Sequence, residues 1–312
     1  MVKPLTPQSA PEFRANPNQA VPTGHQPLIP PPSPMPPSRE NRHRKGDPNL
    51  AALLTWILPG AGHLYLGRIT TGVLGFLLIE GLFLLGLELN GGMTFEYLDH
   101  ELRTAFAPAL SPEAGNLGGF IYQMKTYGFG LEHRRPWPEH MHLGVLLTAL
   151  SGVLNLFLMI HAHLAARSQK DGLSPEVREP VLATALTWVL PGLGHLYQGR
   201  RLRGALVFGT LVGLFVLATV LAEGSNLSRE RHFYYWAGQF LLGLPALLAE
   251  LAFGDMRITH GIRFAEPGLV FGCVAGLLNV LAMIDTFAYG EARSLGLPMK
   301  TLQPEPGEEA PA

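Results

Sequence analysis

A ten-residue motif carrying a histidine, a tyrosine and an arginine occurs twice, at residues 59–68 and 191–200. A histidine ring in such a motif can donate a hydrogen bond to a carbonyl left free by a broken helix. An arginine at the membrane surface keeps its stem in lipid and its head at the phosphates. The candidate binding or structural motif comprises Pro59, Gly60, Gly62, His63, Tyr65, Gly67 and Arg68, and its second copy Pro191, Gly192, Gly194, His195, Tyr197, Gly199 and Arg200.

A second set of candidates consists of polar side chains inside apolar stretches: Glu80, Asn155, Glu250, Asn279 and Asp285. Ionisable groups within a membrane are costly, and they are by default candidates for functional sites. The counterpart of Glu80 in the second copy is Val212, so the repeat does not require this carboxylate. For Glu80 we expect a hydrogen bond to a neighbouring helix, with proton carriage as the alternative.

The sequence contains no motif of a known catalytic or cofactor site. It lacks a nucleophile elbow, a His-Glu-x-x-His pair and a phosphate loop. The pairs His140/His142 and His161/His163 are two residues apart, which on a helix turns them about 200° from each other. We therefore predict no catalytic residue, no metal site and no cofactor, and we expect that the protein is not an enzyme.

Five apolar stretches approach the length of about 20 residues that a helix needs to cross a bilayer. They are Ile69–Leu89, Leu143–Ala166, Gly204–Ala222, Tyr234–Phe253 and Leu269–Ala288. A soluble core in a chain of 312 residues does not accommodate five such helices. The expected fold class is all-α, a polytopic helical membrane protein.

The two motif-bearing segments, 49–66 and 181–198, are shorter. About nine apolar residues precede Pro59 or Pro191, which is about 14 Å of helix and half a bilayer. Non-helical backbone at membrane depth is tolerated only where protein or a cavity covers it. Each segment is therefore predicted to be a short broken helix or a re-entrant hairpin.

The duplication continues beyond the motif, because residues 152–160 match residues 276–284. Asn155 pairs with Asn279 in this match, whereas the position of Asp285 is held by His161 in the first copy. We predict two tandem repeats, each with a broken segment and spanning helices. The expected domains are a disordered Pro-rich tail with a basic end (1–47), repeat one (48–173), repeat two (174–298) and a disordered Pro/Glu-rich tail (299–312).

Charge and cysteine content restrict the partners. A net charge of −1 gives no support for nucleic-acid binding, and the single Cys273 forms no intrachain disulfide. The excess of Lys and Arg beside the broken segments predicts a cytoplasmic N-terminus in the inner (plasma) membrane. The expected partners are the lipid bilayer and either a protein partner or a second copy of the chain.

The run from Leu58 to Arg68 resembles a motif of uncharacterised bacterial multi-pass membrane proteins, Pro-Gly-x-Gly-(His/Gln)-x-Tyr-x-Gly. These proteins are grouped as a domain of unknown function, and the run from Gly276 to Asp285 is similar to their last helix. A weaker similarity links Gly62-His63-Leu64-Tyr65 to the two-transmembrane-helix domain family, whose Asp-Arg-Phe element is absent here. The resemblance implies a membrane protein and supplies no catalytic residues.

Two functions remain in view from the sequence. The first is a non-enzymatic integral membrane protein that acts as a structural or interaction component, in which the motif turns the chain at the membrane surface. The alternative is a transporter, or a protein that binds a lipid or solute, because paired broken segments in two halves are typical of transporter binding sites.

Overall fold

The computed structural model describes residues 46–96, 98, 103–104, 106–129, 136–171, 178–254 and 260–294. This part of the chain consists of helices and turns and contains no strand. Residues 1–45 of the predicted N-terminal tail (1–47) and the whole predicted C-terminal tail (299–312) lie outside the described residues.

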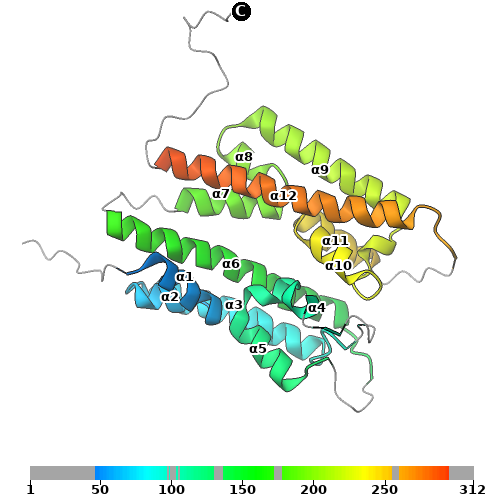
Figure 1. The fold of residues 1–312 in the computed structure, drawn as a ribbon, viewed down its shortest axis with the longest axis horizontal. Coiled ribbons are helices and arrows are strands. Elements are labelled where there is room, and N and C mark those ends of the chain that lie inside the picture. The colour runs from blue at the N-terminus through cyan, green and yellow to red at the C-terminus, as the bar shows by residue number, and fades with distance from the viewer. Residues whose placement is uncertain are drawn as a thin grey trace, which may run out of the picture. The chain divides into compact units, whose positions relative to one another are not determined.

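The two halves have the same order of elements at their ends and differ in the middle (Figure 1). The first half comprises α1 (Pro48–Ile57), α2 (Ala61–Tyr65), α3 (Ile69–Leu89), α4 (Phe106–Ala109), η2 (Pro112–Gly115), α5 (Leu117–Thr126) and α6 (Met141–Asp171). The second half comprises α7 (Arg178–Val189), α8 (Leu193–Tyr197), α9 (Arg201–Leu221), η3 (Ser225–Leu227), α10 (Phe233–Phe240), α11 (Leu244–Phe253) and α12 (Ala265–Ser294).

Four described helices are long and apolar enough to cross a membrane: α3, α6, α9 and α12. Leucines on their outer faces are largely exposed; for example, Leu77 and Leu206 each keep 61% of their surface. Such exposure is unfavourable in water and expected against lipid tails. The protein is therefore an all-α polytopic membrane protein in contact with lipid.

The prediction of one continuous helix over Tyr234–Phe253 is wrong. The chain forms α10 and α11 there, separated by a turn at residues 241–243. Gly243 has a φ of 86°, which L-residues rarely adopt, and Pro245 lies in the first turn of α11. A side chain on Gly243 would also overlap the Trp188 carbonyl oxygen, so the break fits against the end of α7.

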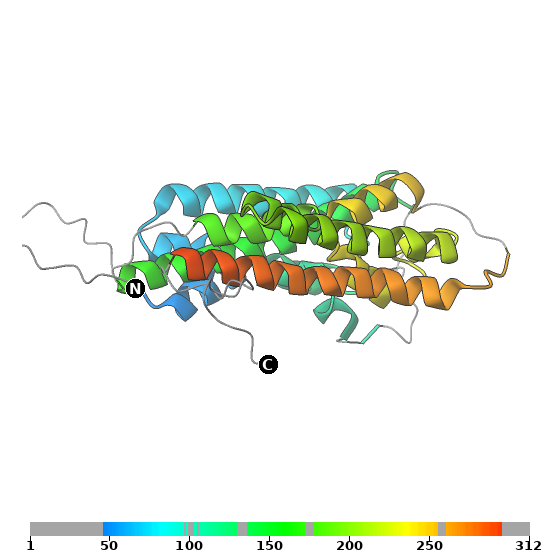
Figure 2. The ribbon, with the colours of Figure 1, turned by 90° about the horizontal axis from the view of Figure 1, so that it is seen from above.

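One long helix in each half is the centre of that half. In the first half α6 packs against α3, α1 and η2, and in the second half α12 packs against α9, α7 and α10. The long helices run side by side in the ribbon (Figure 2). The matching roles of α6 and α12 follow the match between residues 152–160 and 276–284 in the sequence.

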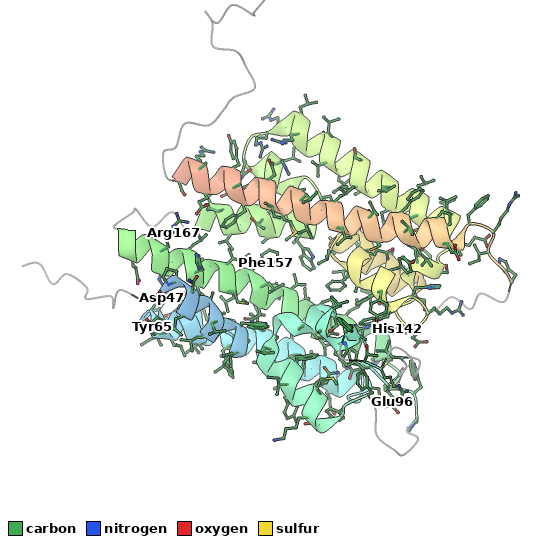
Figure 3. All side chains as sticks on the ribbon, in the orientation of Figure 1. Asp47, Tyr65, Glu96, His142, Phe157 and Arg167 are labelled. Carbon is green, nitrogen blue, oxygen red and sulfur yellow. The ribbon has the colours of Figure 1, made fainter. Side chains whose placement is uncertain are left out.

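The first motif-bearing segment is a helical hairpin that returns to its starting point. The backbone N–H of Asp47 donates to the Tyr65 hydroxyl over 3.2 Å, and the Asp47 side chain caps α1 by accepting from the Leu50 N–H. Figure 3 shows Asp47 and Tyr65 at the end where Arg167 lies, away from Glu96 and His142. The start and the end of this segment therefore lie side by side, which is the arrangement of a helical hairpin.

Aromatic side chains join the two halves. Phe157 on α6 points toward the second half (Figure 3), where its ring lies 6.1 Å from that of Trp188 on α7. Trp188 in turn contacts Phe240, which contacts Trp236. These rings belong to one buried hydrophobic cluster, in which α6 packs against α7 and α10.

Candidate functional site

The Pro-Gly turn of each motif requires its glycine. Leu58 is extended, as residues before proline usually are, and Gly60 follows with a φ of 80°. A side chain on Gly60 would overlap the Gly72 carbonyl oxygen at the start of α3. Gly192 has a φ of 84° and lies in the same way against Gly204. The buried Pro59 and Pro191 precede these glycines, so each proline ends its helix where the chain must turn.

A threonine and an asparagine hold the first hairpin together. The Gly62 N–H donates to Thr55 Oγ1 over 3.1 Å, and that hydroxyl donates to the Ala51 carbonyl over 2.9 Å. Asn155 Nδ2, from α6, donates to the carbonyls of Thr55 (2.9 Å) and Gly115 (3.0 Å). These bonds satisfy carbonyls that the broken helix leaves free.

The second hairpin repeats this arrangement. Asn279 Nδ2 donates to the carbonyls of Thr187 (3.2 Å) and Leu241 (3.0 Å). The Thr187 hydroxyl donates to the Ala183 carbonyl over 2.9 Å, and Gly194 lies so close that a Cβ would overlap that carbonyl oxygen. Asn155 and Asn279 are therefore bound to the hairpins in both halves.

The last glycine of each motif ends the five-residue helix with the same cap. Gly67 and Gly199 have φ values of 76° and 81°. The N–H of Arg68 donates to the His63 carbonyl, and that of Arg200 donates to the His195 carbonyl, both over 2.8 Å. This pairing is the Schellman motif, which places each arginine at the start of the following spanning helix.

The two histidines are buried and have different partners. In the first half His63 Nε2 lies 2.7 Å from His161 Nδ1, and the two rings are stacked. Burial, helped by the charges of His161 and Arg68, lowers the pKa of His63 to about 4. His63 is then neutral near pH 7. The contact between the two ring nitrogens is therefore a hydrogen bond in which one nitrogen donates and the other accepts.

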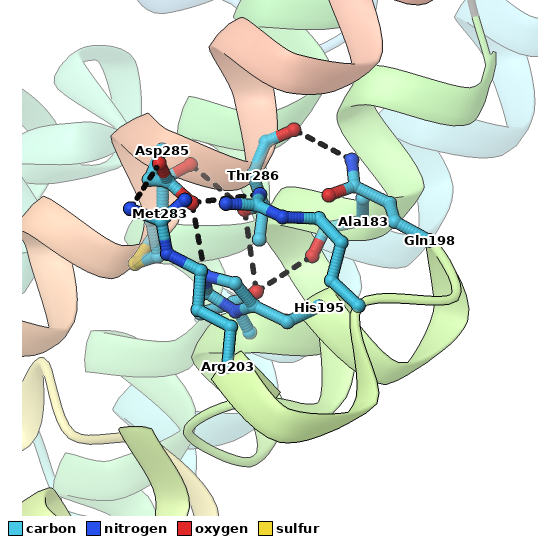
Figure 4. A network of polar contacts seen from close by, with 9 residues as sticks. Ala183, His195, Gln198, Arg203, Met283, Asp285 and Thr286 are labelled. Atoms are coloured by element: carbon cyan, nitrogen blue, oxygen red, sulfur yellow. Dashed lines mark hydrogen bonds and ion pairs between the residues drawn. The ribbon is translucent and has the colours of Figure 1, made fainter. Parts of the chain in front are cut away.

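In the second half a carboxylate occupies the place of His161 and collects three partners (Figure 4). Asp285 Oδ2 lies 3.0 Å from His195 Nε2 and 2.8 Å from Arg200 Nη1. Asp285 Oδ1 lies 3.2 Å from Arg203 Nη2. The arrangement fixes two guanidinium groups and one imidazole around a single carboxylate.

This cluster lies at the boundary between the protein interior and its surface. His195 is buried, whereas the side chain of Asp285 keeps 33% of its surface exposed and that of Arg203 keeps 55%. Burial and the nearby Arg200 lower the pKa of His195, against the opposing effect of Asp285. The guanidinium of Arg200 also lies 4.5 Å above the centre of the Tyr289 ring.

Tyr65 and Tyr197 differ although the motif is the same. The Tyr65 hydroxyl accepts from the N–H of Asp47, whereas Tyr197 is half exposed. Next to Tyr197, Gln198 Nε2 donates to the Thr286 carbonyl over 2.7 Å and ties the second hairpin to α12.

Two of the predicted polar residues lie away from both hairpins. Glu80 on α3 faces the side chain of Asn116, the residue before α5, in the middle of the first half. Glu250 on α11 accepts from Trp236 Nε1 over 2.7 Å, and its burial raises its pKa to about 8.

A buried ion pair that the sequence analysis missed lies near Glu250. Arg229 Nη1 is 3.0 Å from Glu113 Oε1, and both side chains are almost completely buried. The guanidinium carbon of Arg229 lies 4.5 Å above the Trp236 ring, and the Thr148 hydroxyl donates to Glu113 over 3.0 Å. The pair joins the middle segments of the two halves, which are 116 residues apart in the chain.

Some contributors to the site were identifiable from the repeat and others were not. Thr55 and Thr187 occupy equivalent places in both copies, which is a signal for their shared role. Arg203 has Thr71 as its counterpart, so the repeat gives no such signal. Within the described ranges no three His, Cys, Asp or Glu side chains gather closely enough to hold a metal ion.

Comparison with known proteins gives one match. A family model described as "Family of unknown function (DUF6677)" matches residues 50–172 and 182–297, which are the two halves of the described structure. No curated protein and no solved structure matches the chain.

Proposed function

We propose a function from the premise that the chain belongs to the family of unknown function DUF6677. The protein acts as a non-enzymatic structural or interaction component of its membrane. In this role the two hairpins are folding elements that fix the spanning helices α3 and α9 against α6 and α12. A protein partner or a second copy of the chain then docks on this framework.

One observation carries the proposal: the backbone groups and threonine hydroxyls at the turn of each hairpin bond within the protein. The Gly62 N–H and the Thr55 carbonyl are paired in the first half. The Thr187 carbonyl and the Thr187 hydroxyl are paired in the second half. Backbone groups paired in this way stabilise a corner and are not available to a substrate.

The same proposal includes an orientation. The hairpin end of the described helices carries Arg68, Arg167, Arg200, Arg201, Arg203 and Arg293, and the opposite end carries Arg103, Lys125, Arg229, Arg231 and Arg263. Arg229 is buried against Glu113, which leaves fewer exposed cations at the opposite end. By the positive-inside rule the hairpins and the N-terminus are cytoplasmic, in the plasma membrane.

Complementation of a deletion strain tests the structural role. We expect H63Q and H195Q to accumulate in the membrane and to restore the wild-type phenotype, because glutamine keeps a side-chain donor at each position. We expect G192V not to accumulate, because its side chain would overlap the Gly204 carbonyl. An H195Q protein that accumulates fully and fails to complement would overturn the structural proposal.

A second candidate function, binding of a lipid or solute, is favoured by a difference between the halves. The first hairpin ends in a stacked histidine pair beside one arginine, Arg68, whereas the second ends in a partly exposed cluster with two arginines and one aspartate. A corner that served only to turn the chain would not need this charge, which is costly beside lipid.

A further inference from the structure

We infer that the second hairpin is a binding site for an anionic phospholipid, whose phosphate contacts Arg200 and Arg203. The inference rests on the second candidate function, binding of a lipid or solute, and not on the structural role of the hairpins. Its parts are a local excess of positive charge, a groove that leads away from this charge between two spanning helices, and a first half that has Thr71 in place of Arg203 and Leu158 in place of Ala282.

The charge excess follows from the composition of the cluster. Arg200 and Arg203 carry two positive charges, and Asp285 supplies one negative charge to both of them. A guanidinium has five N–H donors, so the contacts to Asp285 leave donors for a second anion. A phosphate diester offers one negative charge and several acceptor oxygens, which would balance the cluster.

The position of the cluster matches that of a lipid headgroup. Arg200 caps the N-terminus of α9 and Arg203 lies in its first turn, at the end of a helix that is long enough to cross the membrane. Arginines at this level extend toward lipid phosphates, and the helix N-terminus adds a partial positive charge. Arg203 remains more than half exposed there.

An apolar groove continues from the cluster between α9 and α12. Its volume is ≈ 360 Å³, and its lining runs from Asp285 and Arg203 to Leu278 and Leu211. The distance from residue 285 to residue 278 along α12 corresponds to about 10 Å of helix. A groove that is charged at one end and apolar along its length fits a phospholipid better than a free phosphate ion.

Residues that line the groove differ between the two halves. Ala282 lines the groove, and its counterpart in the first half is the larger Leu158. Leu158 packs against Gly75 so closely that a side chain at Gly75 would meet it at 2.7 Å. The counterparts of Arg203 and Asp285 are Thr71 and His161, so the charges and the space differ together.

Native mass spectrometry of the full-length protein, titrated with phosphatidylglycerol in detergent, tests the charge. We expect R203Q to bind this lipid about fivefold more weakly than the wild type, from the usual contribution of one basic residue near a membrane. The matched control is R201Q, which removes the same charge from the neighbouring, exposed position of α9. Equal weakening in R203Q and R201Q, or none in R203Q, would overturn the inference.

A second pair of variants tests the groove without changing the charge. The double variant V207G/A282L copies the packing of Gly75 and Leu158, and this packing is already compatible with the fold in the first half. We expect it to weaken phosphatidylglycerol binding as well. Unchanged binding in this variant, together with displacement of the lipid by inorganic phosphate, would assign the site to a free anion and overturn the lipid assignment.

Phosphatidylcholine is the control for the headgroup, since its choline cancels the charge of its phosphate. We expect the wild type to bind it more weakly than phosphatidylglycerol, and we expect R203Q to remove most of this preference. Equal binding of the two lipids by the wild type would contradict a site for an anionic headgroup. The complementation result for the structural role does not depend on these titrations, so the two proposals can fail separately.

Discussion

Close backbone contacts set the most stringent requirements on single residues of the hairpins. Gly194 in α8 lies against the Ala183 carbonyl oxygen and Thr187 Oγ1 of α7. For Gly213 on α9, no atom beyond its chain neighbours and the nearby backbone of its own helix lies within 4 Å of the place where a Cβ would be. The two glycines differ in what surrounds them, although both are helical.

We therefore expect opposite effects of the same substitution at these two positions. G194A should lower the free energy of unfolding by about 3 kcal/mol or more, the upper range for overpacking, because neither neighbouring helix can move freely. G213A should raise it by about 0.5–1 kcal/mol through the higher helix propensity of alanine. Thermal unfolding in one detergent measures both, and a G194A protein as stable as the wild type would contradict the close contact.

His63 makes a contribution to stability that depends on pH. The pKa of His63 is about 4 in the folded protein, against 6.5 for an ordinary histidine. Between these values the unfolded chain binds a proton more readily than the folded one, so stability is complete above pH 6.5 and declines as the pH falls toward 4. Below pH 4 both states are protonated and the decline ends.

The H63Q variant isolates this effect, because glutamine does not titrate. We expect its melting temperature to fall less than that of the wild type between pH 6.5 and about 4. Glu250 acts in the opposite sense, since its raised pKa makes stability decline as the pH rises toward 8. Glu250 is present in both proteins, so its effect cancels when the melting temperature of the variant is subtracted from that of the wild type at each pH. Identical pH profiles would show that His63 is not buried as described.

The repeat allowed individual residues to be predicted where both copies use them in the same way. The motif glycines, Asn155 and Asn279 were all identified, and they hold the hairpins in both halves. Arg203 was not among the candidate residues, because a single sequence does not reveal that it faces Asp285 across 82 positions. Comparison of two copies therefore finds shared structure better than it finds a site present in one half.

At the level of elements, each hairpin depends on an asparagine from the long helix beside it. Asn279 on α12 joins the end of α7 to the turn after α10 through two bonds from one amide nitrogen. Asn155 on α6 joins α1 to η2 in the same way. The asparagine thus ties three elements together where no regular backbone pairing exists.

Replacement of this asparagine by leucine should loosen the hairpin. N279L leaves the carbonyls of Thr187 and Leu241 without their donor, and a buried unpaired group costs about 1–3 kcal/mol. We expect a lower melting temperature and faster proteolysis between α10 and α11, with T70V at an exposed position of α3 as the control. A melting temperature equal to that of T70V would mean that other donors replace the amide.

Hydropathy predicted the long helices well and the break in the second half poorly. The limits of α3 agree with the predicted stretch Ile69–Leu89. The ends of α6, α9 and α12 each lie within two turns of the ends of their own predicted stretches. Residues 234–253 form an apolar run of spanning length, so length and composition alone do not separate α10 from α11. The separation depends on Gly243 and on its contact with Trp188, which is distant in the sequence.

On the scale of the whole molecule, the two halves are joined by aromatic packing and by ion pairs at two levels. Arg229 and Glu113 form a buried pair between the middle segments, and Arg167 and Glu291 form an exposed pair between α6 and α12. The middle segments differ most between the halves, so the repeat could not predict the buried pair. Only the three-dimensional structure identifies the pair, because Arg229 and Glu113 come from segments that have no sequence pattern in common.

The two pairs provide a matched test of what holds the halves together. R229M leaves the carboxylate of Glu113 buried without its cation, which costs about 3–5 kcal/mol, whereas the loss of an exposed pair in R167Q costs about 0–1 kcal/mol. We expect a large drop in melting temperature for R229M and a small one for R167Q. The double variant R229M/E113Q should recover most of the loss, because a neutral glutamine still accepts from Thr148 and no buried charge remains. If R229M melts like R167Q, or if the double variant is no more stable than R229M, the buried pair is not what joins the middle segments.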